Sequence, residues 1–321
     1  MTTRRTVLAL LAALALAALA TSTALAGEGL RFTSPPELYS RGRVSTEFSE
    51  IKVTFSPDGT RVLWGSTNRP GGPGGWDLWE SRKEKDGWSA PAPVPFNSPQ
   101  NDFDPFFATD GKSVYFFSNR PGGSGGDDLY AAPFDPATGQ YGAAQNLGPH
   151  VNTAGDEWAP VVSPDGTTLL FATDGRGGKG LHDLFVASQV KGAWQEPKPL
   201  VEVNGPDEDF DGAFLSDGHT LVFTRRTKDQ DGADLYVAPW RDSHYGAPER
   251  LGPEVNAEKS WNLGPATNPS EPGALYFSSH RPENTAGRLD IYRVGYEVEA
   301  STPKALGPRH SSDPDAARRL K

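Results

Sequence analysis

One stretch, SNRPGGSGGDDLY at residues 118–130, recurs in related form four more times along this chain. The variants are STNRPGGPGGWDLW at 66–79, TDGRGGKGLHDLF at 173–185, TRRTKDQDGADLY at 224–236 and SSHRPENTAGRLDIY at 278–292. Each contains an acid that opens an apolar strand, and these acids lie 51 to 56 residues apart. A fixed period of this length indicates an array, in which each unit buries its apolar faces against its neighbours.

The order of events inside each unit is constant. An acid leads into a short apolar strand, an Asp-Gly turn follows, and a second apolar strand comes next, as at 114–117. Asp-Gly between two such runs is a hairpin signal, because glycine takes the positive φ that the turn requires. The third strand begins at the repeated acid, and a fourth carries an aromatic, a Pro or Ala, and an apolar residue at three-residue spacing, as in Trp88, Pro91 and Val94. The pattern predicts five four-stranded antiparallel sheets, which is the composition of a five-bladed β-propeller.

The composition fits an all-β chain with many turns. Gly and Pro account for 36 and 29 of the 321 residues, while 8 Trp, 9 Tyr and 16 Phe can supply a core. The absence of Cys excludes disulfides, thiolate metal sites and a lipoprotein anchor. The formal net charge of −10 argues against a nucleic-acid partner, because phosphate binding needs a basic surface.

Residues 1–26 have the features of a signal peptide. Arg4 and Arg5 precede an apolar run at 6–20, and Ala24-Leu25-Ala26 is a small-x-small cleavage site. Fifteen helical residues span about 22 Å, less than a bilayer core of roughly 30 Å, so we expect no transmembrane segment. We predict cleavage near Ala26 and a periplasmic or secreted protein, exported by ordinary secretion or through a twin-arginine leader. The mature chain is then one propeller domain at 27–307 with a flexible tail at 308–321.

Several motifs together carry a family resemblance. They are the SPDG turn at 56–59, the SNRPGG loop at 118–123, the DLY strand at 128–130 and LGPHVNTAGDEWAP at 147–160. In these motifs the chain resembles the TolB-type, WD-repeat-like β-propeller family of bacterial envelope and secreted proteins, over residues 46–298. The resemblance implies a binding or scaffolding module, although a fold of this kind does not name a function.

The N-terminus carries a fourth-strand pattern of its own. Phe32, Pro35 and Leu38 match it, whereas the fifth unit has no aromatic residue at the corresponding place. We therefore predict that residues 31–38 complete the last blade and close the ring, which removes two open sheet edges. The alternative places residues 303–307 in that position.

What every blade needs should occur five times, and an asymmetric ligand site should use the positions at which the units differ. An Arg precedes each acid that opens a third strand, and we expect a guanidinium–carboxylate pair to hold each Gly-rich loop. The expected structural pairs are Arg69–Asp77, Arg120–Asp128, Arg176–Asp183, Arg226–Asp234 and Arg281–Asp290. The five aspartates are called the third-strand acids below.

A second set of acids leads into the innermost strands. These inner-strand acids are Glu50, Asp102, Glu157 and Asp209, and the fifth segment is aligned as Ser260-Trp261-Asn262. We expect the acids to bond a neighbouring loop. The alternative is an acidic collar around the channel mouth that holds Ca²⁺, because carboxylate oxygens suit hard cations. No other cofactor is predicted.

Two positions vary among the units and supply most of our candidates for ligand binding; the others are the lead-in tryptophans and His280, which replaces a loop Asn. One position is the third residue of the segment that leads into each innermost strand, and the other directly precedes each third-strand acid. The topology predicts that both lie around one channel mouth. The candidate binding residues are Lys52, Trp76, Asp104, Asp127, Trp158, His182, Asp211, Trp261, Asn262 and His280. Aromatic faces beside carboxylates and amides suit a peptide or a glycan, and the alternatives are a solvated loop surface and, for the two lead-in Trp, core packing.

We therefore predict a monomeric, exported binding or scaffold module for an envelope protein, a peptide or a glycan. Catalysis is less favoured, because the chain has neither an HExxH metal motif nor a GxSxG nucleophile motif. The alternative is a glycan-cleaving hydrolase or lyase that uses rim carboxylates such as Asp104 and Asp211, or His182 or His280 as a base. A hydrolase needs its two carboxyl groups roughly 5 to 9.5 Å apart.

Overall fold

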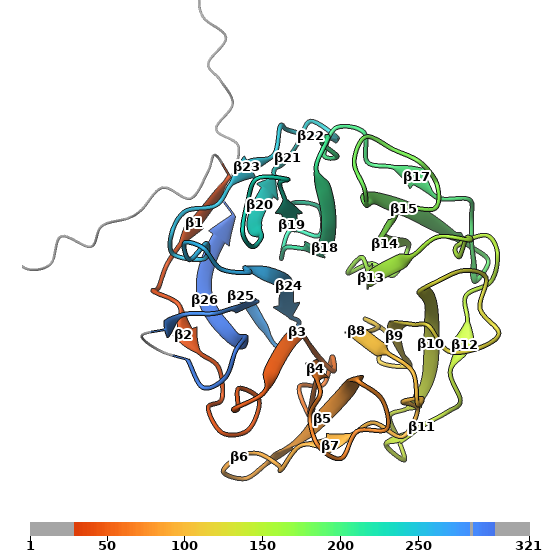
Figure 1. The fold of residues 1–321 in the computed structure, drawn as a ribbon, viewed down its shortest axis with the longest axis vertical. Coiled ribbons are helices and arrows are strands. Elements are labelled where there is room, and N and C mark those ends of the chain that lie inside the picture. Colours follow the sequence, from red (N-terminus) through yellow and green to blue (C-terminus); the bar gives the residue numbers. More distant parts are fainter. Residues whose placement is uncertain (1–28, 283–284, 299–321) are drawn as a thin grey trace, which may run out of the picture.

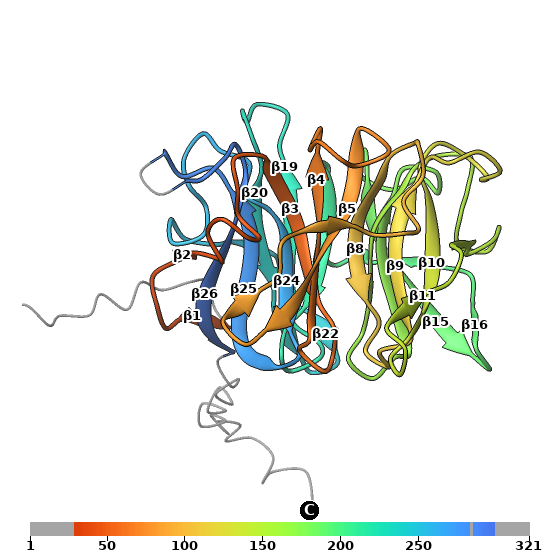
Figure 2. The same cartoon turned by 90° about the horizontal axis from the view of Figure 1, so that it is seen from below.

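The computed structural model describes residues 29–282 and 285–298, so the predicted signal peptide and C-terminal tail lie outside the described residues. Within the described ranges the regular elements are β-strands, and there is no α-helix. The strands form five small antiparallel sheets arranged in a ring (Figure 1). Seen edge-on, the strands run between the two faces of this ring (Figure 2). The chain is a five-bladed β-propeller, as predicted.

The blades follow one another along the chain, and each runs from the axis outward. Blade 1 contains β3 (Ser49–Phe55), β4 (Arg61–Thr67), β5 (Trp76–Glu84), β6 (Gly87–Trp88) and β7 (Ala92–Pro93). Blade 2 contains β8 (Asp102–Phe107), β9 (Ser113–Ser118), β10 (Asp128–Asp135), β11 (Gln140–Tyr141) and β12 (Gln145–Asn146). Blade 3 contains β13 (Glu157–Val162), β14 (Thr168–Thr173), β15 (Asp183–Val190), β16 (Ala193–Trp194) and β17 (Lys198–Pro199). Blade 4 contains β18 (Glu208–Phe214), β19 (Leu221–Arg226), β20 (Asp234–Ala238), β21 (Trp240–Arg241), β22 (His244–Tyr245) and β23 (Glu249–Arg250). Blade 5 contains β24 (Leu263–Asn268), β25 (Glu271–Ser279), β26 (Asp290–Val298), β1 (Leu30–Phe32) and β2 (Glu37–Leu38).

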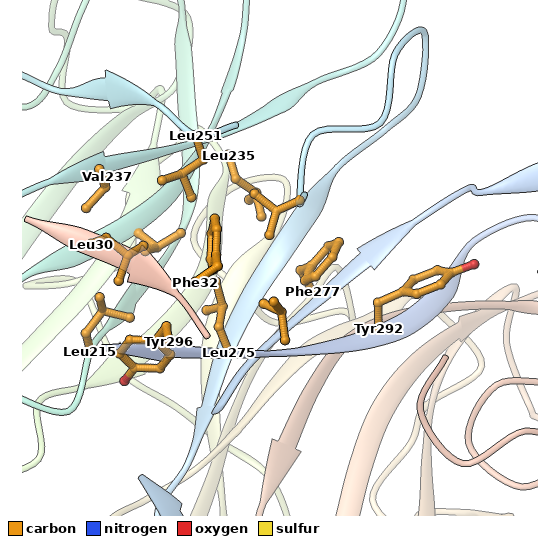
Figure 3. Packing of buried hydrophobic residues seen from close by; sticks show 13 residues of the cluster. Leu30, Phe32, Leu215, Leu235, Val237, Leu251, Leu275, Phe277, Tyr292 and Tyr296 are labelled. Carbon is orange, nitrogen blue, oxygen red and sulfur yellow. The ribbon is translucent and has the colours of Figure 1, made fainter. Parts of the chain in front are cut away.

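The N-terminal strands close the ring, as predicted. β1 pairs with β26 through Leu30↔Val298 and Phe32↔Tyr296, and β2 pairs with the same strand. Leu30 is fully buried and packs with Phe32 among residues of blades 4 and 5 (Figure 3). The chain end is thereby held by both hydrogen bonds and apolar contacts. The alternative closing segment, 303–307, lies outside the described residues.

The hydrophobic core is divided into five clusters, each of which lies mainly between two neighbouring blades. In one of them, Leu63 and Leu78 of blade 1 pack with Phe116 and Tyr130 of blade 2. Close approach of the blades requires Gly65, because a Cβ at this position would lie 2.5 Å from the Phe103 ring. Each blade therefore depends on its neighbours for burial of its apolar faces.

Each innermost strand contains a β-bulge near its start, where the pairing register shifts. The residue in each bulge has positive φ, namely 50° to 52° in Lys52, Asp104, Ala159 and Asp211, and 61° in Gly264. The equivalence of Gly264 corrects our alignment of the fifth unit. Asn262, not Ser260, takes the place of the inner-strand acid, because this unit has one extra residue between Asn256 and its innermost strand.

Candidate functional site

Three of the predicted binding residues, Lys52, Asp104 and Asp211, meet inside the ring. They project from the bulges of blades 1, 2 and 4 and are only 2%, 6% and 3% exposed. We predicted that these side chains lie around the channel mouth, which is wrong. The bulge turns them toward the axis, and the axis of a five-bladed ring is narrow enough for blades 2 and 4 to touch across it. We call these three residues the axial cluster.

The contacts of the axial cluster define its charge. The Lys52 ammonium donates to the carbonyl oxygens of Gly212 and Pro265, each at 3.1 Å. Asp211 accepts a hydrogen bond of 3.0 Å from the Gly264 N–H and is also hydrogen-bonded to Asp104. Burial raises the pKa of Asp104 well above its usual range, and the neighbouring charge of Asp211 adds to this effect. Burial raises the pKa of Asp211 as well, but the Gly264 N–H favours its charged form. We therefore infer that Asp104 carries the shared proton and that the Asp211 carboxylate balances Lys52.

A cavity of about 330 Å³ lies at one end of the axis, with Lys52 among its lining residues. All five blades contribute to it from the second halves of their innermost strands. Its apolar lining includes Phe55, Phe107, Val161, Phe214 and Pro265. We call it the channel cavity, and we call the face onto which it opens the hairpin face, because the turns between first and second strands lie there.

The predicted binding face was the opposite one, which carries the segments leading into the innermost strands. We call it the lead-in face. The channel cavity was missed because its lining residues are apolar and similar in every unit, so a comparison of repeats treats them as structural. Their position beyond each bulge, where five apolar strands converge, is the signal that could have indicated it.

On the lead-in face, three predicted residues do come together. The Trp158 indole N–H donates to the Asp127 carboxylate at 2.8 Å, and its ring stacks on His182 with centroids 3.7 Å apart. His182 Nδ1 lies 2.9 Å from Oε1 of Glu208, which we did not predict. Burial raises the pKa of Asp127, whereas the hydrogen bond with His182 lowers the pKa of Glu208.

The remaining candidates are dispersed over blades 1 and 5. Trp76 is 41% exposed and its ring packs on Phe103 at 4.9 Å. Trp261 is 38% exposed and lies under the Arg226 guanidinium at 5.3 Å. Asn262 is buried, and the His280 N–H donates to Ser260. The structure therefore does not bring all ten predicted residues into one site.

The repeated arginines do not pair with the third-strand acids, which corrects our prediction. Arg69 and Arg120 bond the inner-strand acids Glu50 and Asp102 at 3.4 Å and 2.5 Å. In blade 4 the equivalent bond to Asp209 comes from Arg225, while Arg226 pairs with Glu208. Arg176 pairs with Glu196, and Arg281 donates to the Glu254 carbonyl.

The third-strand acids instead accept hydrogen bonds mostly from their own Gly-rich loops. Asp183, for example, accepts from the Lys179 and Gly180 N–H groups at 2.8 Å and 3.1 Å. Asp77, Asp128 and Asp290 bond loop N–H groups in the same way, whereas Asp234 bonds Gln230 and Arg250. The tight loops direct their N–H groups at these carboxylates, so Arg69, Arg120 and Arg226 bond acids of the innermost strands instead.

All four inner-strand acids are fully buried. Glu157 accepts from the Thr153 N–H and hydroxyl at 2.9 Å and 2.6 Å, and Glu50 makes the same contacts with Thr46. Asp102 and Asp209 accept from the backbone of the preceding loops at Ser98 and Gly205. These carboxylates bond neighbouring loops, and calcium binding at them stays a prediction without a supporting contact.

Comparison with known proteins supports the fold and does not identify a function. No family model matches the chain, and no curated protein does. Among solved structures, a thermostable family-43 glycoside hydrolase has a TM-score of 0.53 at 9% identity, over 83% of this chain and 94% of that one. An α-L-arabinofuranosidase from Podospora anserina has a TM-score of 0.49 at 11% identity, over 84% and 97%.

TolB from Acinetobacter baumannii is also similar, with a TM-score of 0.46 at 15% identity over 77% of this chain. The chain spans about half of that protein, 55% of its length. The similarity to the family-43 glycoside hydrolase, at 9% identity, shows a shared fold alone. Across 29–282 and 285–298, no helix has the length and apolarity to cross a membrane.

Proposed function

We propose that this chain is an exported binding module that holds a peptide segment of an envelope protein in the channel cavity. The observation that carries the proposal is the channel cavity itself, an apolar space of about 330 Å³ bounded by all five blades. Ligand sites are usually concave, mainly apolar and largely formed before binding, with volumes of roughly 300 to 1,000 Å³.

The chemistry of the channel cavity favours a peptide over a glycan. Of its 23 lining residues, 16 are aromatic, proline or aliphatic and seven are polar or charged. Two of these polar groups are already engaged, since Thr54 accepts from the Phe107 N–H and Thr267 donates to the Phe214 carbonyl. An apolar side chain fits such a wall, whereas the hydroxyl groups of a sugar would lose hydrogen bonds to water there.

The axial cluster limits how deep a ligand can enter. Lys52 is bonded to two carbonyl oxygens, and the carboxyl groups of Asp104 and Asp211 bond each other beside it. These buried groups separate the channel cavity from the lead-in face. The ligand is therefore a chain end or a loop that enters from the hairpin face, not a strand threaded through the ring.

The two carboxyl groups predicted as acid and base for glycan cleavage are not placed for that reaction. Asp104 and Asp211 are buried and hydrogen-bonded to each other, which leaves no space between them for a substrate or a water. The similarity to glycoside hydrolases, at 9% and 11% identity, concerns the fold only. We also propose that the chain is exported, which the leader at 1–26 supports. A relationship to the TolB-type family is likewise proposed, and the repeated motifs support it.

A display experiment tests the proposal. The mature chain, residues 27–321, is immobilised, peptides are selected from a random library, and the affinity of the selected peptides is measured by fluorescence anisotropy. Ser216 lies exposed beside the channel cavity, so Ser216→Trp should block it, whereas Ser216→Ala is the matched control. We expect the Trp variant to weaken binding at least tenfold. Equal affinity of both variants, or new reducing ends released from a polysaccharide panel, would contradict the proposal.

A further inference from the structure

Three side chains of blade 3 gather on the lead-in face, far from the channel cavity. Asp156 precedes β13, Asp174 follows β14, and His182 precedes β15. One potential ligand atom from each lies within 4.8 Å of the other two. The group is half-open, because Asp174 is exposed, Asp156 is half-buried and His182 is buried.

Blade 2 shows that the loop structure does not require these carboxylates. Asp156 donates its N–H to Oδ1 of Asp174 at 2.8 Å, and in blade 2 Asn101 donates its N–H to Oδ1 of Asn119 at 3.0 Å. A backbone hydrogen bond is also shared: the Asp174 N–H donates to the Asp156 carbonyl, and the Asn119 N–H donates to the Asn101 carbonyl. An amide oxygen is therefore sufficient for the fold. Two neighbouring carboxylates repel each other, so their presence in blade 3 indicates another use.

His182 supplies an independent observation. The side chain is 6% exposed, and its ring is held between Trp158 and Glu208. Because the Glu208 carboxylate can only accept, Nδ1 carries a proton, and in the neutral imidazole Nε2 is then the free ligand atom. Within the described residues, Nε2 is buried without a hydrogen-bond partner. Buried polar atoms normally have a hydrogen-bond partner, so this unpartnered nitrogen beside two carboxylates requires an explanation.

We propose that Asp156, Asp174 and His182 bind one divalent transition-metal ion, with Glu208 orienting the imidazole. A histidine nitrogen with two carboxylate oxygens suits Zn²⁺ or Mn²⁺, whereas Ca²⁺ takes oxygen ligands alone. A carboxylate that fixes the other ring nitrogen is the usual second partner of a metal-bound histidine. Three protein ligands leave a coordination position open toward solvent, where a carboxylate or imidazole of a partner molecule can bind.

The contacts of the two aspartates are consistent with this assignment. Oδ1 of Asp156 accepts from the Asp127 N–H at 2.8 Å, and Oδ1 of Asp174 accepts from Asp156. Both carboxylates are thereby held in position by backbone groups before any ion arrives. Gly126 permits this arrangement, because a Cβ there would lie 2.1 Å from Oδ1 of Asp156.

The test uses the chelator-treated mature chain and isothermal titration with ZnCl₂ and, separately, MnCl₂. We expect one ion per chain and a metal-dependent rise in melting temperature. Asp156→Asn with Asp174→Asn reproduces the side chains of blade 2, so the variant should keep its near-UV circular dichroism. It should bind the ion at least tenfold more weakly. Asp231→Asn removes an exposed acid from a loop on the same face of blade 4 and should bind as the unaltered chain does.

Three results would overturn the proposal. In the first, the unaltered chain takes up neither ion stoichiometrically. In a second, the double Asn variant binds Zn²⁺ and Mn²⁺ as tightly as the unaltered chain. In a third, Asp231→Asn weakens binding as much as the double variant, which would show general attraction of cations to an acidic surface.

Discussion

Removal of one charge from the axial cluster should reveal which of its two aspartates is ionised. We infer that Asp104 carries the proton shared by the two carboxyl groups, so that Asp211 alone balances Lys52. Asp104→Asn therefore exchanges one neutral donor for another. Asp211→Asn removes the only carboxylate charge and leaves the Lys52 ammonium buried, although the Asn oxygen can still accept from the Gly264 N–H.

Asp211→Asn should lower the free energy of unfolding severalfold more than Asp104→Asn. Removing one partner of a buried charge pair costs about 3 to 5 kcal/mol of unfolding free energy. We expect about 3 kcal/mol for Asp211→Asn, the lower end of this range, because two carbonyl oxygens still hold Lys52. In a domain of this size that corresponds to a fall in melting temperature of roughly 6 to 12 °C. Asp104→Asn should stay within about 1 kcal/mol, since hydrogen bonding is largely conserved.

Urea denaturation followed by tryptophan fluorescence measures both variants, and Lys52→Met completes the comparison. The Lys52→Met/Asp211→Asn double variant should recover part of the loss, because it leaves no unpaired charge. Equal destabilisation by Asp104→Asn and Asp211→Asn would refute the assigned protonation. Strict additivity of Lys52→Met and Asp211→Asn would refute the electrostatic coupling itself.

Three further variants test other parts of the ring. Burial raises the pKa of Glu50 from 4.5 to about 7, so the folded state binds an extra proton between these pH values and stability should fall as pH rises through them. Glu50→Gln should remove this pH dependence, which is on the order of 3 kcal/mol. Urea titrations at about pH 5 and pH 8 measure it. Arg120→Ala leaves Asp102 buried without its guanidinium and should cost about 3 kcal/mol. Arg82→Ala removes an exposed guanidinium from Glu80, which Arg61 still pairs with, and should cost less than about 1 kcal/mol; similar thermal melts for the two would contradict this. Leu30→Ala should cost about 2 to 5 kcal/mol because the residue is fully buried where the ring closes, and a calorimetric melting temperature no lower than that of Arg31→Ala would argue against closure by the N-terminus.

Several structural features were predictable from short stretches of sequence. The Asp-Gly turns are one, since Gly59, Gly111, Gly166 and Gly218 all have φ between 67° and 76°. Ring closure by β1 and β2 is another, because Phe32 and Leu38 carry a pattern that the fifth unit lacks. Both depend on residues that act within one strand or turn.

The arginine partners were mispredicted for a physical reason. Sequence spacing placed Arg120 near Asp128, but the Gly-rich loop already satisfies Asp128 with the N–H groups of Ser124 and Gly125. Arg120 therefore reaches Asp102, which lies on the neighbouring strand of the same blade. Backbone donors in a tight loop are not visible as residue types, so the repeated pattern could not reveal them.

The number of blades, the order of strands and the closing segment can be read from the chain alone, because they follow from its period of about 50 residues and from local turn chemistry. Which side chains share a site depends instead on the folded ring. Lys52 and Gly212, or His182 and Glu208, come from different blades and meet because the ring brings their strands together. The bulges that turn Asp104 and Asp211 toward the axis depend on pairing with the second strands. Contacts of this kind arise from the closed ring, so no local pattern in the chain specifies them.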